Sequence, residues 1–567
     1  MRRSLVPVST VALAITAVFA VPVHAQRVLG VGDDALVLPR GVLRVRTIGQ
    51  WTSFNERYGM DTPGRPNGAL EPLGIDFTLD TIGVREFPNL ASLQAGLRSL
   101  TGNPNFSLTL GNTRVNLNDR VAAIPFVIEA GLSQRFSIGI QIPYVETTSS
   151  VFFGVNTNQR EGNLGFNPAL AIATAAAQNA TMFTQFSTAA ATLEASLNAC
   201  AANPSASPQC PALNAQAANG RALIANSSAF AGGVYQIYSG GSAGVTFASP
   251  FVPITGTDAQ LAIEARVAAF RALYASFGVN SITSTGPFAA QNRLTLADAQ
   301  TILSAPAFGV AADPLQTTTR GHIGDIDVGG KFLVFDSFGS GPEARMSPKG
   351  LNFRASIGGV VRLPTGQSDS PNNFIDIGTG NGQTDLEGRL FADLLVGSHF
   401  WQSFVVRYND QLADNQFMRI IDLPNKELAP LYRRQKVRRD LGNAFEFETS
   451  PRIVLNDFFA VSGQYLYRHK GQDHYTGTFA VDSAVTGFAD ITLDASTLDL
   501  ETETTEHRLG GGISFSNLFA FQEGKAKIPF EATYLHWQTV KGAGGNQPKF
   551  FTDQIQLRLY ARLFGGK

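Results

Sequence analysis

The chain has 567 residues, a formal net charge of −1, and charged residues at 16% of its length, below the ~25% of ordinary soluble domains. A net charge this close to zero argues against nucleic acid as a partner, because phosphate backbones are bound by clusters of Lys and Arg. The low charged fraction, with 56 Gly and 41 Phe, favours a membrane β-barrel without requiring one.

The first segment predicts export. Residues 1–3 are Met-Arg-Arg, residues 11–21 are apolar but too short to span a membrane, and residues 23–25 form a small-residue cleavage site. We therefore expect a signal peptide over residues 1–25. No later window holds ~20 consecutive apolar residues, so no transmembrane helix is expected. An exported chain of this kind is periplasmic, secreted or an outer-membrane barrel.

Alternation of apolar and polar residues begins near Val42 and recurs to the end of the chain. Because side chains alternate across a strand with a period of two, each stretch predicts a strand with one apolar and one polar face. In the last stretch, Ile555 and Leu557 lie opposite Arg558 and Arg562. The expected strands lie at about residues 43–50, 124–130, 136–144, 325–334, 351–363, 385–396, 403–409, 445–455, 459–468, 508–515, 528–534 and 551–564.

These strands predict a barrel rather than a sandwich. Strands of ~10–14 residues can cross a bilayer when tilted. A soluble sandwich would also alternate, but here the polar faces carry charges of both signs. Aromatic residues such as Tyr144, Trp401 and Trp537 also stand at strand ends, as interfacial girdles require. We predict an all-β, transmembrane antiparallel β-barrel of about 12 strands (range 10–14) in the cell outer membrane, with an α-helical extracellular insertion.

Short turns alternate with long loops along the chain, and bacterial barrels place the short turns in the periplasm and the long loops outside. This divides the chain into four parts: the signal peptide at 1–25, N-terminal barrel strands with a helix-bearing loop at 26–149, an Ala-rich helical insertion at 150–320, and the remaining barrel strands at 321–567.

Helices are expected at residues 168–200, 258–277 and 296–303, which are Ala-rich, and at residues 88–100, where four Leu share one stripe. In the second of these the apolar residues at helical spacing are Leu261, Ala265, Ala268, Ala269, Ala272 and Leu273. Two interpretations stay open: the helices pack on each other over the rim, or they form a lid that controls entry.

The two cysteines, Cys200 and Cys210, flank a Pro-containing stretch of an exported chain, which predicts a disulfide. Neither a C-x-x-C motif nor a nearby His suggests metal or redox chemistry, and no cofactor is expected. A Gly-rich loop with Asp369, Asp376 and Asp385 offers oxygen ligands for Ca²⁺, but it lacks the EF-hand spacing, so no metal site is predicted.

The polar strand faces predict the lining of the lumen. A barrel of twelve strands is intermediate between filled eight-stranded barrels and open porins, so inward Arg and carboxylate groups can meet across the bore. They either stiffen the barrel or line a polar pore for anionic or zwitterionic solutes. The expected pore-lining residues are Arg44, Arg46, Glu129, Asp325, Asp327, Lys331, Arg354, Arg362, Asp385, Glu387, Arg389, Asp393, Arg407, Glu446, Glu448, Arg452, Arg468, Arg508, Glu531, Arg558 and Arg562.

Several short motifs carry a family resemblance. They are, in order, GDDALVLPRG at 32–41, FNERY at 54–58, GLSQR at 131–135, GDIDVG at 324–329, RLPTG at 362–366 and GQTD at 382–385. Together they resemble the outer-membrane proteins of the meta-pathway of phenol degradation family, over most of the barrel but not the long insertion. The resemblance implies a channel for aromatic or other hydrophobic compounds. The fatty-acid transporter family is a more distant relative, and its N-terminal plug motif is not recognisable here.

The predicted function is therefore passive uptake of small molecules, including aromatic or hydrophobic compounds, through an outer-membrane channel. Expected partners are outer-membrane lipid, lipopolysaccharide (through the basic run 433–439), a small-molecule solute and the outer-membrane assembly machinery. One alternative is a structural or adhesive barrel without transport. The other is an outer-membrane enzyme, for which His469 and His474 near Asp473 and Asp482 are the candidates. No catalytic residue is predicted, because no nucleophile motif accompanies them.

Overall fold

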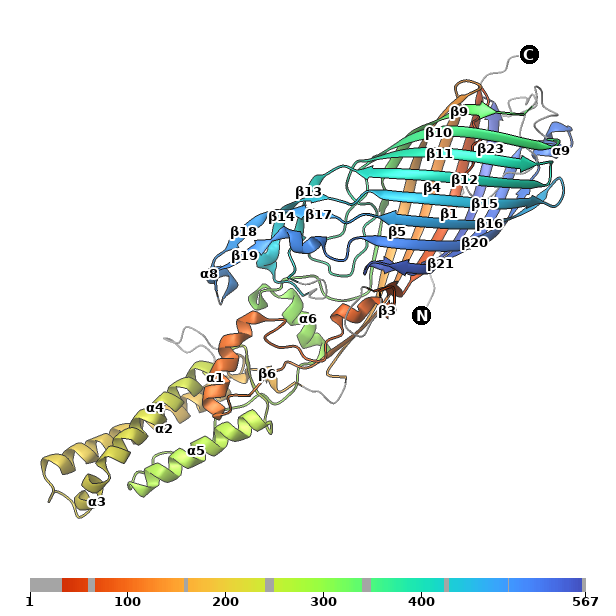
Figure 1. Cartoon of the computed structure of the whole chain (residues 1–567). Coiled ribbons are helices and arrows are strands. Elements are labelled where there is room, and N and C mark those ends of the chain that lie inside the picture. The colour runs from red at the N-terminus through yellow and green to blue at the C-terminus, as the bar shows by residue number, and fades with distance from the viewer. Residues whose placement is uncertain are drawn as a thin grey trace.

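A computed structural model describes residues 33–59, 67–157, 162–239, 249–338, 348–422, 428–487 and 489–562. The expected signal peptide and the end of the last predicted strand, beyond Arg562, lie outside the described residues. The molecule consists of a barrel that continues at one end into loops and an elongated helical unit (Figure 1). Within the described ranges, none of the helices has the length and apolar character needed to cross a membrane.

The barrel is a single antiparallel sheet that closes on itself, because the last strand pairs with the first along twelve residue pairs from Val42–Arg562 to Ser53–Phe551. Two consecutive strands, β8 and β9, pair with successive parts of β5 and together fill one position. The barrel therefore has 12 strands, as predicted. In order around the barrel these are β1 (Val42–Phe54), β4 (Thr113–Gly131), β5 (Phe136–Val155), β8 (Thr318–Ile323) with β9 (Ile326–Asp336), β10 (Leu351–Leu363), β11 (Asp385–Val396), β12 (Phe400–Gln411), β15 (Ala444–Val454), β16 (Phe459–Lys470), β20 (Thr504–Ser516), β21 (Phe530–Ala543) and β23 (Phe551–Arg562).

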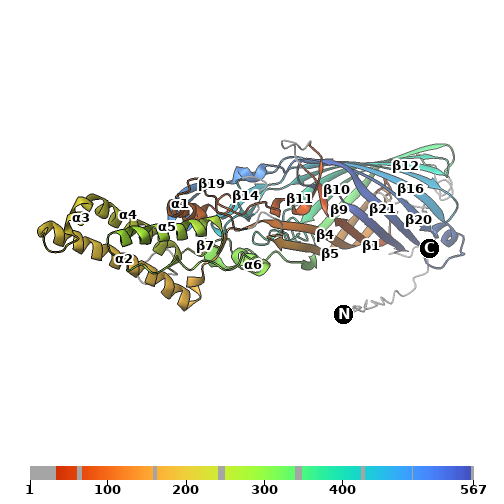
Figure 2. The same ribbon diagram turned by 90° about the horizontal axis from the view of Figure 1, so that it is seen from below.

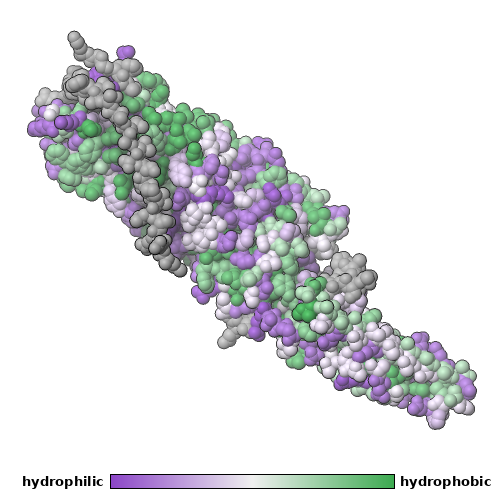
Figure 3. All heavy atoms as spheres, turned by 180° about the vertical axis from the view of Figure 1, so that it is seen from behind, coloured by the Kyte–Doolittle hydropathy of each residue, from purple (hydrophilic) through white to green (hydrophobic). Residues whose placement is uncertain are grey.

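The two faces of these strands have opposite character. On β23, Ile555 is 52% exposed on the outer face, whereas Arg558 is 4% exposed and points into the barrel. Other strands of the sheet also expose apolar side chains on the outer face, among them Ile128, Ile357 and Leu390. Figure 3 shows hydrophobic residues gathered over the barrel and hydrophilic residues over the loop region that follows it. An outer surface this apolar matches the lipid-facing band of membrane barrels.

Connection lengths separate the two ends of the barrel. At one end, short turns at residues 132–135, 397–399 and 455–458 join neighbouring strands. At the other end, two of the connections, residues 55–112 and 156–317, are much longer. Val42, the first residue of β1, pairs with Arg562, the last residue of β23, and the neighbouring Leu43 pairs with Ala130 beside the turn at 132–135. The first strand therefore begins, and the last strand ends, at the short-turn end.

The helical unit is built from both of these long connections. Their side chains share one hydrophobic core, in which Leu97 of the first connection and Leu193 of the second are fully buried. The helices are α1 (Ala91–Thr101), α2 (Ala173–Ala202), α3 (Cys210–Ala215), α4 (Ala217–Tyr238), α5 (Asp258–Ser276) and α6 (Leu296–Ser304), with the short strands β6 (Leu164–Phe166) and β7 (Phe251–Pro253). Helices α2 to α5 extend away from the barrel (Figures 1 and 2), which favours packing outside the rim over a lid within the bore.

Each of the four predicted helical ranges overlaps an observed helix (α1, α2, α5 or α6), and the predicted disulfide Cys200–Cys210 joins α2 to α3. The apolar stripe expected on α5 is wrong. Leu261 and Leu273 are half exposed, and the buried face instead carries Ile263, Val267 and the ring of Tyr274. Bulky residues bury more apolar area than Ala, so they decide which face turns inward.

Smaller elements complete the loops at the long-loop end. They are β2 (Glu56–Tyr58), β3 (Leu70–Pro72), β13 (Asp414–Arg419), β14 (Arg434–Asp440), β17 (His474–Thr476), β18 (Thr478–Val481), α8 (Ser483–Thr486), β19 (Ile491–Asp494) and β22 (Gln547–Pro548), whereas α9 (Leu518–Gln522) lies at the short-turn end. The three-stranded sheet β13-β14-β17 continues the barrel wall outward (Figure 1).

Candidate functional site in the barrel lumen

The segment before β1 lies inside the barrel. Ala35 has no exposed surface, and its backbone N–H donates to Asp393 Oδ2 at 3.0 Å. Its carbonyl accepts a hydrogen bond from Ser356 Oγ at 2.6 Å. Lys331 Nζ donates to the carbonyl of Asp34 at 2.8 Å. Residues 33–38 are therefore fixed to the inner wall by side chains of three different strands, and we call them the N-terminal plug.

Apolar contacts close the short-turn end around this plug. Leu38 and Val42 pack in one buried cluster with Trp401, Leu518 and Tyr560. A second small cluster holds Ala35 against Phe391 and Val405. Because such contacts exclude water, the plug fills this end of the lumen instead of lying loosely in it.

Buried charged groups surround the plug and contact a carboxylate, an aromatic ring or a hydroxyl group. Arg354 NH2 lies 2.5 Å from Asp393 Oδ2, and both side chains are at most 5% exposed. The guanidinium of Arg452 lies 4.0 Å from the ring centre of Trp401. On the opposite wall, the hydroxyl of Tyr560 donates to Glu531 Oε2 at 2.5 Å. This part of the lumen is packed, which matches the stiffening role considered for the inward charges.

Beyond the plug the lumen widens into a cavity of about 360 Å³. Its charged lining consists of the guanidinium groups of Arg46, Arg362, Arg389, Arg407, Arg468 and Arg558 and the carboxylates of Asp33, Asp327, Glu387, Glu446 and Glu448. Asp33 belongs to the plug, so the wall alone carries six cations and four anions. A polar cavity of this size holds water and small solutes.

Ion pairs organise this cavity. Arg407 NH2 contacts Glu448 at 2.7 Å and the plug residue Asp33 at 3.0 Å. Arg362 bridges Asp327 at 2.9 Å and Asp385 at 3.1 Å. The guanidinium fork suits such double contacts, which fix each of these cations between two carboxylates.

A smaller pocket of about 110 Å³ adjoins the cavity, and Arg44, Arg46, Glu129 and Lys331 are among its lining residues. Glu129 receives Arg44 Nε at 2.6 Å and Arg46 Nε at 3.2 Å. Two arginines therefore share one carboxylate here, which leaves an excess of positive charge.

The structure thus places most of the expected lining residues inside the barrel. Arg508 also faces inward, paired with Glu506 and with its guanidinium 4.7 Å from the ring centre of Phe550. The prediction that Asp325 lines the pore is wrong. Asp325 stands at the break between β8 and β9, where its carboxylate accepts the backbone N–H groups of Gly366 (2.8 Å) and Asn381 (3.0 Å). Asp325 fixes a loop and does not line the bore.

Asp33, Asp34 and Glu506 are among the inward groups that the sequence analysis did not identify. Asp33 and Asp34 precede the first strand and have no alternation to reveal them, and Glu506 stands two residues before Arg508 on the same face. The inward orientation of Glu506 could have been predicted from that of Arg508, because residues i and i+2 of a strand share a face.

The weaker candidates have structural partners in the loops. Asp369 accepts the backbone N–H of Gly378, and burial raises the pKa values of Asp369 and Asp376. The described residues contain no cluster of His, Cys, Asp and Glu suited to a metal ion. His474 Nδ1 lies 3.4 Å from Asp499, an exposed contact, and Asp482 caps α8.

A buried arginine joins several loops. Arg419 of β13 donates five hydrogen bonds, among them to the carbonyls of Val310 (2.7 Å), Pro371 (2.8 Å) and Ala429 (2.6 Å). Burial lowers the pKa of Arg419 to about 10. Its bonds tie the end of the helical insertion to the loops that follow β10 and β12.

No family model and no curated protein matches the chain. Among solved structures, the chain resembles the "COG4313 outer membrane channel" of Pseudomonas putida F1, with 7% identity, a TM-score of 0.40, and coverage of 94% of this chain and 100% of that one. It also resembles a Pseudomonas aeruginosa FadL homologue (7% identity, TM-score 0.25, coverage 92% and 91%) and the Ralstonia pickettii toluene transporter TbuX (8%, 0.25, 93% and 90%). With TM-scores this low, the likenesses carry no argument about function, and membership of the phenol-degradation family stays an expectation.

Proposed function

We propose that this protein is an outer-membrane channel for the passive uptake of small molecules, and that the N-terminal plug closes its short-turn end. The observation that carries the proposal is the charged cavity of about 360 Å³ inside a closed barrel with an apolar outer surface. A barrel that served only as a surface anchor would need no such cavity. Hydrogen bonds and ion pairs hold the plug, so its release breaks no covalent bond.

The solutes that suit this bore are small anions, including aromatic carboxylates. Six guanidinium groups face four carboxylates on the wall, so a negative solute meets a net attraction. The six arginines of the wall also offer successive binding positions, so an anion can pass from one guanidinium group to the next. Uptake of aromatic or hydrophobic compounds agrees with the family resemblance, and the charged wall favours those that carry an acidic group.

Solute entry into proteoliposomes tests this proposal. Benzenesulfonate and trimethylphenylammonium have similar size and opposite permanent charge, and neither crosses lipid readily. We expect benzenesulfonate to enter faster, and Ala35→Trp to speed both solutes, because Ala35 has no room for an indole beside Phe391. Entry no faster than in protein-free liposomes, from a barrel that still shows heat-modifiable mobility, would contradict the proposal.

A second candidate, a surface adhesion role, is favoured by the elongated helical unit, which extends away from the barrel (Figure 2). In the basic run, Arg434, Lys436 and Arg438 are exposed along one face of β14 and suit contact with lipopolysaccharide phosphates. Binding of the intact protein to lipopolysaccharide micelles, with and without Lys436→Glu, tests that contact. Equal binding by both proteins would count against it.

A further inference from the structure

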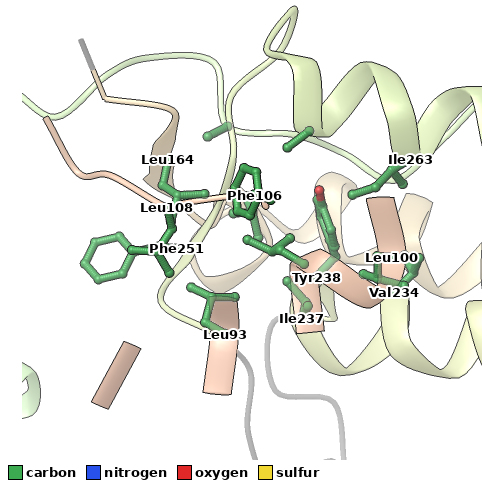
Figure 4. Close-up of a cluster of buried hydrophobic side chains, with 14 of the residues drawn as sticks. Leu93, Leu100, Phe106, Leu108, Leu164, Val234, Ile237, Tyr238, Phe251 and Ile263 are labelled. Atoms are coloured by element: carbon green, nitrogen blue, oxygen red, sulfur yellow. The ribbon is translucent and has the colours of Figure 1, made fainter. Parts of the chain in front are cut away.

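A second large cavity, of about 1010 Å³, lies in the helical unit. Its walls come from α1, α4 and α5, from β7 with the residues before it, and from the short 3₁₀ helix η4 (Pro306–Phe308). Four of its lining side chains, Leu93 and Leu100 from α1, Ile237 from α4 and Phe251 from β7, belong to the cluster of buried hydrophobic side chains in Figure 4. Its volume is at the upper end of the roughly 300–1,000 Å³ typical of small-molecule sites.

The walls combine an apolar, partly aromatic part with polar side chains such as Asn226 and Gln236. Phe230, Phe270 and Phe251 are each at most 9% exposed, and Leu90 and Ile302 add aliphatic surface. Such walls bind an apolar body by removing it from water. Helices α1 and α4 approach closely at Gly96 and Gly233, where a Cβ would lie 3.0 Å from the side chains of Ile237 and Leu100 respectively.

A single charged side chain lines this cavity among the described residues, and it is Arg266 of α5. Its NH1 group donates to the carbonyls of Ser99 (2.7 Å) and Leu100 (3.0 Å) at the end of α1. Its guanidinium carbon lies 5.0 Å from the ring centre of Phe230. These contacts hold the guanidinium in place, while Nε and NH2 have no hydrogen-bond partner within the described part of the chain.

We propose that this cavity binds an apolar molecule that carries one carboxylate. A guanidinium edge with two free donors matches the two oxygens of a carboxylate, and none of the described lining residues is acidic and would repel it. The apolar body lies against Phe230, Phe270 and the leucines of α1. A neutral ligand would leave the donors of Arg266 unmatched, and a cationic one would be repelled by Arg266. The site does not depend on conduction through the barrel.

Photolabelling of the full-length protein in amphipol locates the ligand. The probe is dodecanoate with a diazirine at its far end, and the labelled peptides are identified by mass spectrometry. We expect saturable labelling of residues 87–100 and 226–237, which excess dodecanoate removes and dodecanol does not. Competition by 4-butylbenzoate would assign the site to aromatic carboxylates as well as aliphatic ones. Labelling confined to the barrel, or labelling that never saturates, would overturn the proposal.

Two matched pairs of variants test the residues. Arg266→Gln should weaken dodecanoate binding by about tenfold or more, the loss of a charged hydrogen-bonded contact, but should leave the weaker binding of the neutral methyl ester unchanged. Arg271→Gln removes an exposed charge from the same helix and should change neither. Equal weakening of acid and ester by Arg266→Gln, or no weakening, would refute the role of Arg266.

Filling the cavity gives an independent check in case Arg266→Gln disturbs the end of α1. Ala229→Trp places an indole in the lining and should abolish saturable labelling. Ser228→Trp puts the same ring on the opposite, exposed face of α4 and should leave labelling unchanged. Undiminished labelling in Ala229→Trp would show that the ligand lies elsewhere. Because these measurements record binding alone, they can succeed where the channel proposal fails, and the reverse.

Discussion

The carboxylate of Asp393 connects the plug to the barrel wall, and its replacement by Asn is the sharpest perturbation of the lumen. Asp393 has no exposed surface and accepts from Arg354 (2.5 and 3.1 Å), from the N–H of Ala35 (3.0 Å) and from Ser403 Oγ (2.9 Å). Asn has the same shape but no charge, and it offers one acceptor oxygen instead of two.

The expected cost can be worked from these contacts. Breaking a buried ion pair costs about 3–5 kcal/mol, since the remaining charge stays in a poorly solvating site. Losing one further neutral hydrogen bond, such as that from Ala35, adds about 1 kcal/mol. Arg354 keeps the rings of Trp401 (5.4 Å) and Phe338 (5.6 Å), which offset part of the loss. We therefore expect a destabilisation of about 3 kcal/mol.

The assay is urea unfolding of the refolded protein in detergent, followed by tryptophan fluorescence and by heat-modifiable mobility. The matched control is Glu446→Gln, because Glu446 is 26% exposed and contacts Arg468 at 3.3 Å, so about 0–1 kcal/mol is expected. If Asp393→Asn and Glu446→Gln destabilise equally, or if Asp393→Asn stays within about 0.5 kcal/mol of the parent, the assignment of a tightly coupled plug anchor is wrong.

Three further perturbations address the loops and the helical unit. Arg419→Ala should cost about 2–4 kcal/mol in local stability, because it strands several buried carbonyls; limited proteolysis should cut the loops faster with the barrel intact, and a rate equal to that of the parent would contradict this. The double change Cys200→Ser and Cys210→Ser opens a loop with a sequence separation of 10, which should cost the helical hairpin about 3 kcal/mol, seen as faster hydrogen exchange in α2 and α3 but not in β23. The raised pKa values of Asp369 and Asp376 mean that the folded loop binds protons more tightly than the unfolded one. The loop should therefore gain stability as the pH falls from 7 toward about 4, with slower loop opening by hydrogen exchange after correction for the intrinsic rate, and faster opening would reverse the sign.

The barrel was predictable because each of its strands repeats the same signal. The alternation of lipid-facing and polar residues depends only on neighbouring residues of one strand, and it is the same whatever the twist or tilt of that strand. Ile555 and Arg558 already display it within four residues. Strand number and inward charges followed from the same pattern.

The plug was not predictable in this way. Residues 33–38 are too few to show a period, and their burial depends on partners such as Asp393, 358 positions away in sequence. Asp325 occupies an alternating position that would face the lumen in a continuous strand. The break between β8 and β9 instead directs its carboxylate to backbone N–H groups. Helix α4 was missed because Gly220, Gly232 and Gly233 lower its intrinsic helical propensity, which tertiary packing on α2 overrides.

The central claim, that the lumen is a solute path closed by the plug, is tested most directly by single-channel conductance in planar bilayers. The comparison is between the full-length protein and a variant lacking residues 33–36, both shown to be heat-modifiable barrels. We predict rare, small steps for the full-length protein and several-fold larger ones for the variant. Anion selectivity should also increase, because the variant loses Asp33 from a lining that keeps its six arginines. Equal conductance in the two proteins, or no steps from either at any voltage, would contradict the claim.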